Sequence, residues 1–196
     1  VLTNDPWLGT GHRNDVVFMA PVFHKGRLVA FAGSEAHWSD IGGLIWGTSA
    51  RSVHEEGLGI PPMKLFSEGK PNDTLLEMIR YNSRAPDEVM GDLFAQVGAL
   101  EVCDRMLVEF LEQYDLSDLK LLSHEIQTRA ETAMRAAIRK VPDGTYCSTI
   151  NLDGFEGFPL KIECAITVSE DEIEVDYGGT SGQTDLAAIN VASTYT

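Results

Sequence analysis

The stretch "VVFMAPVFHKGRLVAFAG", residues 16–33, sets the N-terminal part of the fold. Two runs rich in β-branched and aromatic residues flank "HKG", and this pattern predicts an antiparallel hairpin. Gly26 supplies the positive φ that a tight hairpin turn requires. Pro21 has no N–H to donate to a neighbouring strand, so we expect it at a sheet edge or a bulge.

Helical periodicity dominates the middle of the chain. Residues 85–114 carry apolar side chains at helical spacing, with Pro86 at a plausible first helical position. A second helix is expected from about Ser117, a possible N-cap, to Lys140. Its small residues predict close packing against the first helix, and they are Ala130, Ala133 and Ala137.

The last third changes to a period of two. Apolar residues alternate with charged ones through "LKIECAITVSEDEIEVDY", residues 160–177, which predicts an antiparallel hairpin with one wet, acidic face. "PDGTY" before it and "YGGTSGQ" after it are turns by composition. Between the first hairpin and the helices, residues 34–65 are rich in Gly, Ser and His and predict a long loop.

These elements predict an α+β fold with antiparallel β-hairpins at both ends and a long helical pair between them. We divide the chain into a glycine-rich β-hairpin and metal-loop region (1–70), a helical region (71–141) and an antiparallel β region (142–196), all within one domain. The chain begins without Met and ends without a polar tail. We therefore interpret it as a fragment of a larger protein.

The amino-acid composition limits the classes of binding partner and the cellular compartment that we expect. With 15 basic and 30 acidic residues the formal net charge is −15, which disfavours nucleic acid and anionic membranes as partners. Three widely spaced cysteines argue against both a disulfide framework and a thiolate zinc site. The chain has no apolar run long enough to span a bilayer and no signal pattern, so we expect a cytoplasmic location.

The N-terminal quarter carries two H-x-x-D pairs, one on each side of the hairpin. Asp15 follows His12 by three residues, and Asp40 follows His37 by three. In an antiparallel hairpin, the residue numbers of each cross-strand pair add up to the same value. If the turn has three residues and Phe23 pairs with Arg27, this value is about 50, and a two-residue turn changes it by one. His12 then lies opposite Trp38 and beside His37, because cross-strand neighbours stand roughly 5 Å apart.

Imidazole and carboxylate groups in this arrangement are typical ligands of catalytic Zn²⁺, Mn²⁺ or non-haem Fe²⁺. The alternative is that the aspartates cap turns and the histidines are surface residues. The glycine-rich stretches "WLGTG" and "GTSG" lack the Walker lysine of a phosphate-binding loop. Trp7, Trp38 and Trp46 lie in the same region, where they either wall a substrate pocket or fill a core.

The residues that carry this chemistry also follow a known pattern. "NDPWLGTGHRND" (4–15), the hairpin and then "AHWSDIGG" (36–43) resemble the hydantoinase B/oxoprolinase family, with its N-D-P-x-x-G-x-x-H-x-x-D-V and A-H-x-x-D-x-G-G stretches. The resemblance continues in collinear order through "EEGLGIPPMKLF", "RYNSRAPDEVMGDLFAQVGA", "VPDGTY" and "INLDGFEG". It therefore covers nearly the whole chain.

The resemblance implies a B-type component that works with a hydantoinase A-type ATPase, which phosphorylates the substrate with ATP. Such proteins hydrolyse cyclic amides such as hydantoins, 5-oxoproline and lactams, and relatives carboxylate acetone or acetophenone. The implied ligands of a divalent metal, zinc or manganese, are His12, Asp15 and His37, with Asp40 next and His54 a weaker fifth. "GTGH" replaces the commoner G-G-T-H order, which leaves the substrate open between a cyclic amide and a ketone.

As a mechanism, we expect the metal to lower the pKa of a bound water toward 7. Glu35 and Asp5 are the nearby carboxylates that can act as general base, and we assign Asn4, Trp7 and Trp38 to substrate binding. Two other classes of function remain open. The chain is either a non-catalytic interaction fragment whose long helices contact the ATPase, or a metal-storing or sensing module that needs no ATP.

Overall fold

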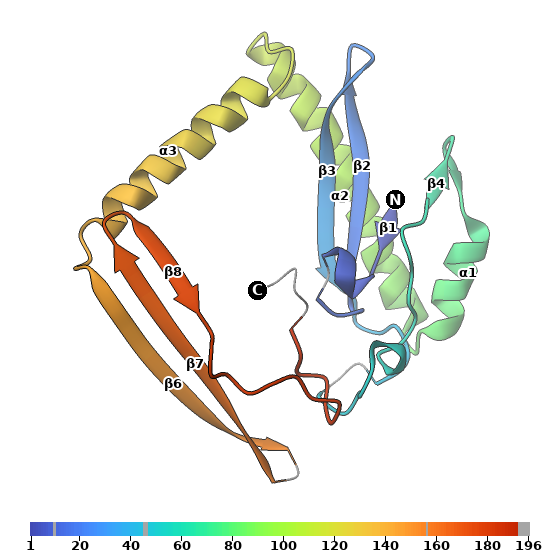
Figure 1. The fold of residues 1–196 in the computed structure, drawn as a ribbon. Helices are drawn as coiled ribbons and strands as arrows, with labels where there is room; N and C mark the ends of the chain where they lie inside the picture. The colour runs from blue at the N-terminus through green and yellow to red at the C-terminus, as the bar shows by residue number, and fades with distance from the viewer. Residues whose placement is uncertain (10, 45–46, 156, 192–196) are drawn as a thin grey trace. The chain divides into compact units, whose positions relative to one another are not determined.

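The computed structural model describes residues 1–9, 11–44, 47–155 and 157–191 (Figure 1). It has the predicted α+β composition, with antiparallel strands near both ends and helices between them. The chain divides into two compact units, one formed by residues 1–118 with the C-terminal segment from 184, the other by residues 119–183. The predicted helical region, 71–141, is thus shared between the two units.

The first unit is built on the predicted N-terminal hairpin. Its sheet has the order β1-β2-β3 and comprises β1 (Leu2–Thr3), β2 (Asp15–His24) and β3 (Arg27–His37). Lys25 and Gly26 both have positive φ, as a two-residue type I′ turn requires. β3 extends to His37, into a segment that was expected to be a loop.

The register differs from the one expected. His24 faces Arg27, and a bulge between Val22 and Phe23 shifts the pairing by one further residue, so that Asp15 faces His37. The prediction that His12 lies opposite Trp38 is therefore wrong. The sequence pattern does not reveal the bulge, because apolar residues occupy both faces of the strands near the turn.

Pro21 lies at an edge, as predicted. The N–H of Met19 donates to the carbonyl of Val1, and amides two residues apart along a strand point the same way. β1 pairs with Val17 and Phe18 and does not extend as far as Pro21. The side of Pro21 on which another residue would carry an N–H therefore lies beyond the end of β1.

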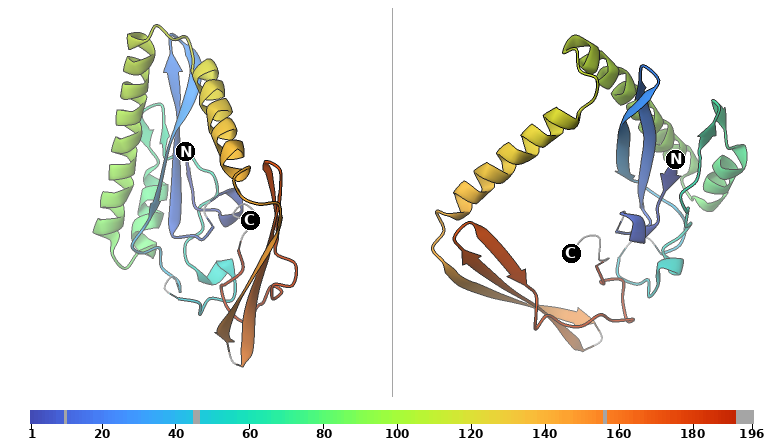
Figure 2. Two further views of the ribbon diagram at one scale, coloured as in Figure 1. Left: turned by 90° about the vertical axis from the view of Figure 1, so that its left-hand side faces the viewer. Right: turned by 45° about the horizontal axis from the view of Figure 1, so that its top comes forward.

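Helix α2 (Pro86–Gln113) covers one face of this sheet, as Figures 1 and 2 show. The even-numbered residues of β2 point toward it, and Val16 and Phe18 are almost completely buried. The helix contributes Val89 and Leu93, both fully buried, to the same core. The odd-numbered residues, which begin with Asp15, therefore point away from the helix.

The helices agree in part with those expected. α2 matches the expected helix closely, whereas α3 (Lys120–Ile138) begins three residues after Ser117, and Leu119 is its N-cap. α2 and α3 belong to different compact units, so the packing of the three α3 alanines against α2 stays a prediction. α1 (Asp73–Asn82) was not predicted as a separate helix, although Asn72 caps it by accepting from the Leu75 N–H at 3.2 Å.

Short elements fill the segment between β3 and α1 and the segment before β2. They are η1 (Pro6–Leu8), η2 (Val53–Glu55), β4 (Phe66–Ser67) and β5 (Lys70–Pro71). A bridge between Leu2 and Met63 ties this long connection to the first strand. Residues 56–63 of the predicted loop are therefore held by contacts with the N-terminal segment.

The second unit contains α3 and a three-stranded antiparallel sheet of order β6-β7-β8. The strands are β6 (Gly144–Phe155), β7 (Phe158–Ser169) and β8 (Glu172–Asp176). β7 and β8 form the predicted hairpin. β6 was not predicted, and the last residues of "PDGTY", expected to be a turn, begin this strand. None of the described helices has the length and hydropathy needed to cross a membrane.

Candidate metal centre

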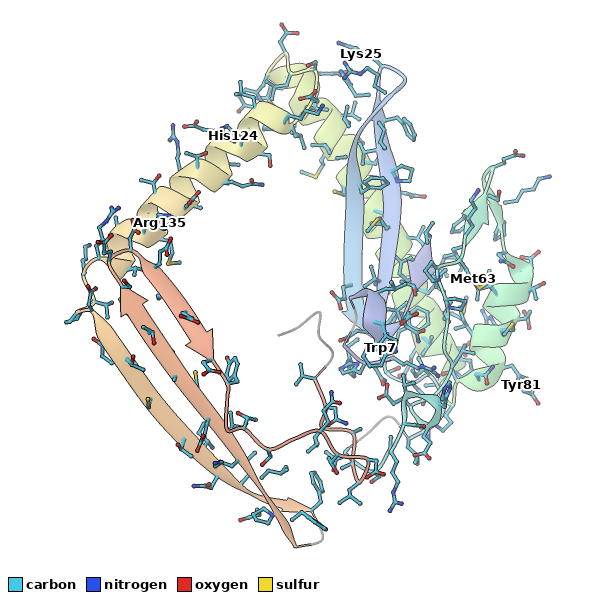
Figure 3. The ribbon with its side chains drawn as sticks, in the orientation of Figure 1. Trp7, Lys25, Met63, Tyr81, His124 and Arg135 are labelled. Carbon is cyan, nitrogen blue, oxygen red and sulfur yellow. The ribbon has the colours of Figure 1, made fainter. Side chains whose placement is uncertain are left out.

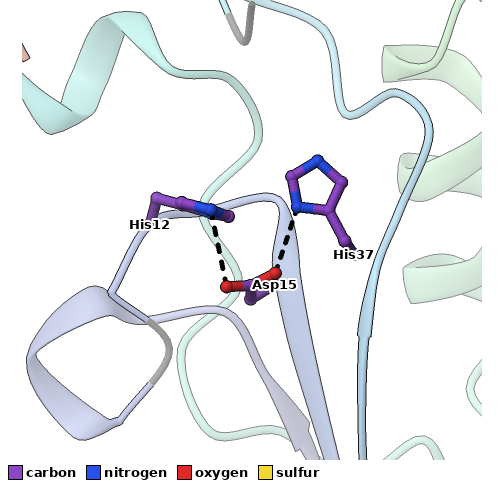
Figure 4. A group of neighbouring side chains, drawn as sticks. All are labelled: His12, Asp15 and His37. Atoms are coloured by element: carbon purple, nitrogen blue, oxygen red, sulfur yellow. Dashed lines mark hydrogen bonds and ion pairs between the residues drawn. The ribbon is translucent and has the colours of Figure 1, made fainter.

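Three of the predicted ligands meet at the open end of the first hairpin (Figure 4). His12 Nε2 lies 3.5 Å from Asp15 Oδ2, and His37 Nδ1 lies 3.1 Å from Asp15 Oδ1. The rings of the two histidines stand edge to face, with centroids 5.1 Å apart. One ligand atom from each residue lies within 4.8 Å of the other two.

The sheet register positions two of these side chains. Asp15 is the first residue of β2, His37 is the last residue of β3, and they face each other directly across the ladder. His12 reaches them from the preceding turn, in which the Asp15 N–H donates to the His12 carbonyl at 3.3 Å. The bulge near the hairpin turn thus determines that His37, rather than Ala36, faces Asp15.

The geometry fits a divalent cation. Two ligand atoms about 2.1 Å from a tetrahedral ion are about 3.4 Å apart, close to the distance from His12 to one carboxylate oxygen of Asp15 and from His37 to the other. The side chains of His12 and His37 are 49% and 44% exposed, so one side of the cluster is open to solvent. Such an open side is typical of catalytic rather than structural zinc sites.

Asn4 holds the turn that carries His12. Its side-chain NH₂ donates to the carbonyls of Arg13 and Leu58, both at 2.8 Å, and its Oδ1 accepts from the Ile60 N–H at 2.6 Å. Asn4 is completely buried. It was expected to bind substrate, but its amide is already committed to the backbone, so it positions the turn instead.

Asp40, the predicted fourth ligand, lies elsewhere. Its carboxylate accepts hydrogen bonds from the Arg84 side chain, the Arg84 N–H and the Ser83 hydroxyl. Burial alone would raise the pKa of Asp40, but the hydrogen bonds from Arg84 and from the Gly42 N–H, together with the positive charge of Arg84, outweigh it and lower the pKa to about 2. Asp40 thus ties the loop after β3 to the start of α2, and this use of its carboxylate replaces the predicted ligand role.

Trp38 also has a structural role. It is completely buried in the first core, and its Nε1–H donates to Gln96 Oε1 at 2.8 Å. A side chain in this position cannot wall a substrate pocket. Trp46, considered for the same role, lies outside the described residues.

A hollow of about 300 Å³ lies in the first unit between the N-terminal segment and η2. Trp7, labelled in Figure 3, contributes to its wall together with Arg13 and His54, and its side chain is 65% exposed. Asp5 also lines it, with one carboxylate oxygen accepting from the Trp7 N–H at 3.0 Å. His54, the weaker fifth ligand, therefore lies at the hollow and outside the three-residue cluster.

Glu35 remains close to the cluster along the strand. It lies two residues before His37 on β3 and faces Val17 across the ladder. Side chains two residues apart share one face of a strand, so Glu35 and His37 project from the same face. Glu35 is exposed, as a group that exchanges protons with solvent must be.

Gln96, which is 5% exposed on α2, was not predicted to take part in the site. The sequence contains a pattern that could have identified Gln96. Val89, Leu93 and Leu100 mark the buried stripe of the helix at helical spacing, and Gln96 occupies the same stripe. A polar residue in an apolar stripe requires a buried hydrogen-bond partner.

A sequence model described as hydantoinase B/oxoprolinase matches residues 1–196. The chain belongs to this family. A Pseudomonas sp. (strain NS671) protein named as the B component of a D-/L-hydantoinase is 33% identical over 201 residues, which cover 97% of this chain and 34% of that protein. The caprolactamase beta chain of Pseudomonas jessenii is 36% identical over 177 residues, 88% of this chain and 30% of that protein.

Solved structures agree with this family assignment. The crystal structure of the ATP-dependent caprolactamase from Pseudomonas jessenii matches with a TM-score of 0.80 and 35% identity, covering 89% of this chain and 31% of that one. An acetone carboxylase structure shares the fold, with a TM-score of 0.77 at 17% identity over 92% of this chain and 26% of that one. The chain thus spans about a third of the length of these hydantoinase B/oxoprolinase relatives.

Proposed function

We propose that the first unit carries the metal centre of a B-type component of an ATP-dependent cyclic amidohydrolase. The observation that carries this proposal is the convergence of His12, Asp15 and His37 in a chain of the hydantoinase B/oxoprolinase family. The family description and the relatives named hydantoinase and caprolactamase favour a hydantoin, 5-oxoproline or lactam as the substrate class.

The chemistry follows from the stability of the amide. The nitrogen lone pair stabilises the carbonyl of an unstrained cyclic amide, so we expect an A-type ATPase partner in the cytoplasm to phosphorylate the oxygen first. A divalent ion, zinc or manganese, would then supply a water molecule of lowered pKa or polarise the reacting group. His12, Asp15 and His37 would hold this ion in place.

Other residues of the first unit take the remaining roles. Glu35, on the same strand face as His37, is the favoured acceptor for the proton that the attacking water releases. Asp5 is the second candidate for this role, since it lines the hollow beside Trp7. Trp7 offers an exposed aromatic face at that hollow, so we assign it to substrate binding.

A test combines metal content with turnover. The protein is purified with its ATPase partner, as wild type and as His12→Ala, Asp15→Ala and His124→Ala variants. His124 is a matched control because it is an exposed histidine on α3 (Figure 3). We expect about one divalent ion per chain and ATP-dependent ring opening for the wild type and the control, and loss of both for the other two variants.

The outcomes separate the alternative functions. ATP-dependent consumption of a ketone with bicarbonate, and none of a cyclic amide, would assign the protein to the carboxylase branch, whose fold it shares. Metal binding without ATP-dependent turnover would favour a storage or sensing module. A wild-type protein that binds the ATPase but holds no divalent ion would leave an interaction role and overturn the proposal.

A further inference from the structure

Gln96 joins the two strand ends that carry Asp15 and His37. Its Oε1 accepts from the Trp38 Nε1–H at 2.8 Å, and Trp38 follows His37 directly. Its NH₂ donates to the carbonyl of Val16, the neighbour of Asp15, at 3.0 Å. The same NH₂ group reaches the Ser34 hydroxyl at 3.4 Å on β3.

These contacts lie on the buried side of the sheet. α2 packs against the even-numbered residues, while Asp15 and His37 project from the opposite face. Gln96 therefore does not touch the proposed metal position, and it acts on the ligands through the backbone of β2 and the indole of Trp38. Because the three groups are buried, an unpaired donor or acceptor among them would destabilise this arrangement.

We infer that Gln96 is a positioning residue that holds Asp15 and His37 at the separation needed to share one cation. This inference rests on the proposed metal centre. The strand ends are also tied directly: the Trp38 N–H donates to the Asn14 carbonyl at 2.9 Å, and the Asn14 side-chain NH₂ donates to the Trp38 carbonyl at 3.3 Å. Gln96 adds a connection from outside the sheet, which fixes the hairpin end against the long helix.

The hydrogen-bond partners around residue 96 require an amide side chain. The Trp38 indole requires an acceptor, whereas the Val16 carbonyl requires a donor, and a neutral amide offers both. Glutamate at this position would keep the bond from Trp38 and place a carboxylate oxygen against the Val16 carbonyl. Methionine would keep the volume and remove both hydrogen bonds.

The test uses the full chain as wild type, Gln96→Met, Gln96→Glu and the control Gln127→Met. Gln127 is a matched control because it is an exposed glutamine of α3. Zinc dissociation constants are measured by competition with a chromophoric chelator, and Co²⁺ absorption reports the ligand geometry. In the metal-free protein, the NOE between the His12 and His37 imidazole protons reports their proximity.

We expect both Gln96 variants to bind zinc about tenfold or more weakly, the effect typical of groups that support metal ligands. The Co²⁺ spectrum should change and the imidazole NOE should weaken, while Gln127→Met stays unchanged. If the wild type binds zinc and the Gln96 variants bind it equally well, the inference is overturned.

Two further results keep this inference separate from the proposed function. If the wild type binds no zinc, the metal proposal fails, and the NOE alone decides whether Gln96 holds His37 beside the segment that carries His12 and Asp15. If Gln96→Met does not fold, Trp38→Phe replaces it, because that change removes the indole donor and retains an aromatic ring in the core. An unchanged zinc affinity and NOE in Trp38→Phe would then overturn the inference.

Discussion

The two three-stranded sheets of this chain have similar sequence patterns and different surroundings. In the first, α2 covers one face, and Val16 and Val22 are completely buried. In the second, the apolar face formed by alternate residues of β6, β7 and β8 stays largely exposed. Its exposed side chains include Ile150 at 55%, Leu152 at 47%, Ile162 at 41% and Val175 at 48%.

The contrast between the sheets indicates where a site can be held rigidly. Period-two alternation specifies which residues share a face, but the burial of that face depends on a second element that packs against it. The candidate metal ligands lie on the sheet that has such an element. Side chains fixed by a packed scaffold keep the spacing that shared ligation of one ion demands.

We expect the greatest loss of stability from a change in the core of the first unit. Leu93 on α2 is completely buried against the hairpin, so Leu93→Ala should reduce the free energy of unfolding by about 3 kcal/mol. Ile150→Ala, on the exposed face of the second sheet, should cost less than about 1 kcal/mol. Urea unfolding monitored by circular dichroism measures both, and equal losses would contradict the contrast between the sheets.

The next effect concerns acid stability of the first unit. The pKa of Asp40 falls from 3.8 to about 2 on folding, so its ionised form stabilises the fold by about 2 kcal/mol at neutral pH. This stabilisation is complete above about pH 4 and is lost as the pH falls through about 2. Asp40→Asn should therefore be less stable at neutral pH and show a flatter pH dependence across that window.

The measurement for Asp40 is urea unfolding at a series of pH values. Asp143→Asn is a suitable control, since this exposed aspartate lies in the second unit and accepts one hydrogen bond, from the Glu170 N–H. If Asp40→Asn retains the wild-type slope in the acid window, another group is responsible for it.

Local patterns were sufficient to predict the first hairpin, the long helix α2 and the last hairpin, and the family resemblance ranked the residues of the cluster ahead of Asp40. They were insufficient where the outcome depends on distant partners. Asp40 has the same spacing from His37 as Asp15 has from His12, yet Arg84, 44 residues away, binds it. Trp38 and Asn4 are buried for the same reason, since the elements that cover them come from distant parts of the chain.

A smaller effect is expected at the helix starts. The Asn72 side chain accepts from the Leu75 N–H and caps α1, so Asn72→Ala should destabilise the first unit by about 1 kcal/mol. Ser117 precedes α3 without serving as its N-cap, and Ser117→Ala should change the stability by a few tenths of a kcal/mol at most. Thermal unfolding distinguishes the two, and a larger loss for Ser117→Ala would reverse the assignment of the caps.

The weakest effect tests how α3 is stabilised. This helix has no buried residue among those described, so local interactions contribute a larger share of its stability than they do in α2. Glu125 and Arg129 form an i,i+4 pair at 2.7 Å, with the acid on the N-terminal side, the favourable orientation. Arg129→Gln should lower the protection of α3 amides in hydrogen exchange by about 0.3–0.5 kcal/mol, and about 1 M salt should abolish the difference. A loss well above about 1 kcal/mol would mean that Arg129 has a partner beyond its own helix, and the contrast between a packed α2 and an unpacked α3 would no longer hold.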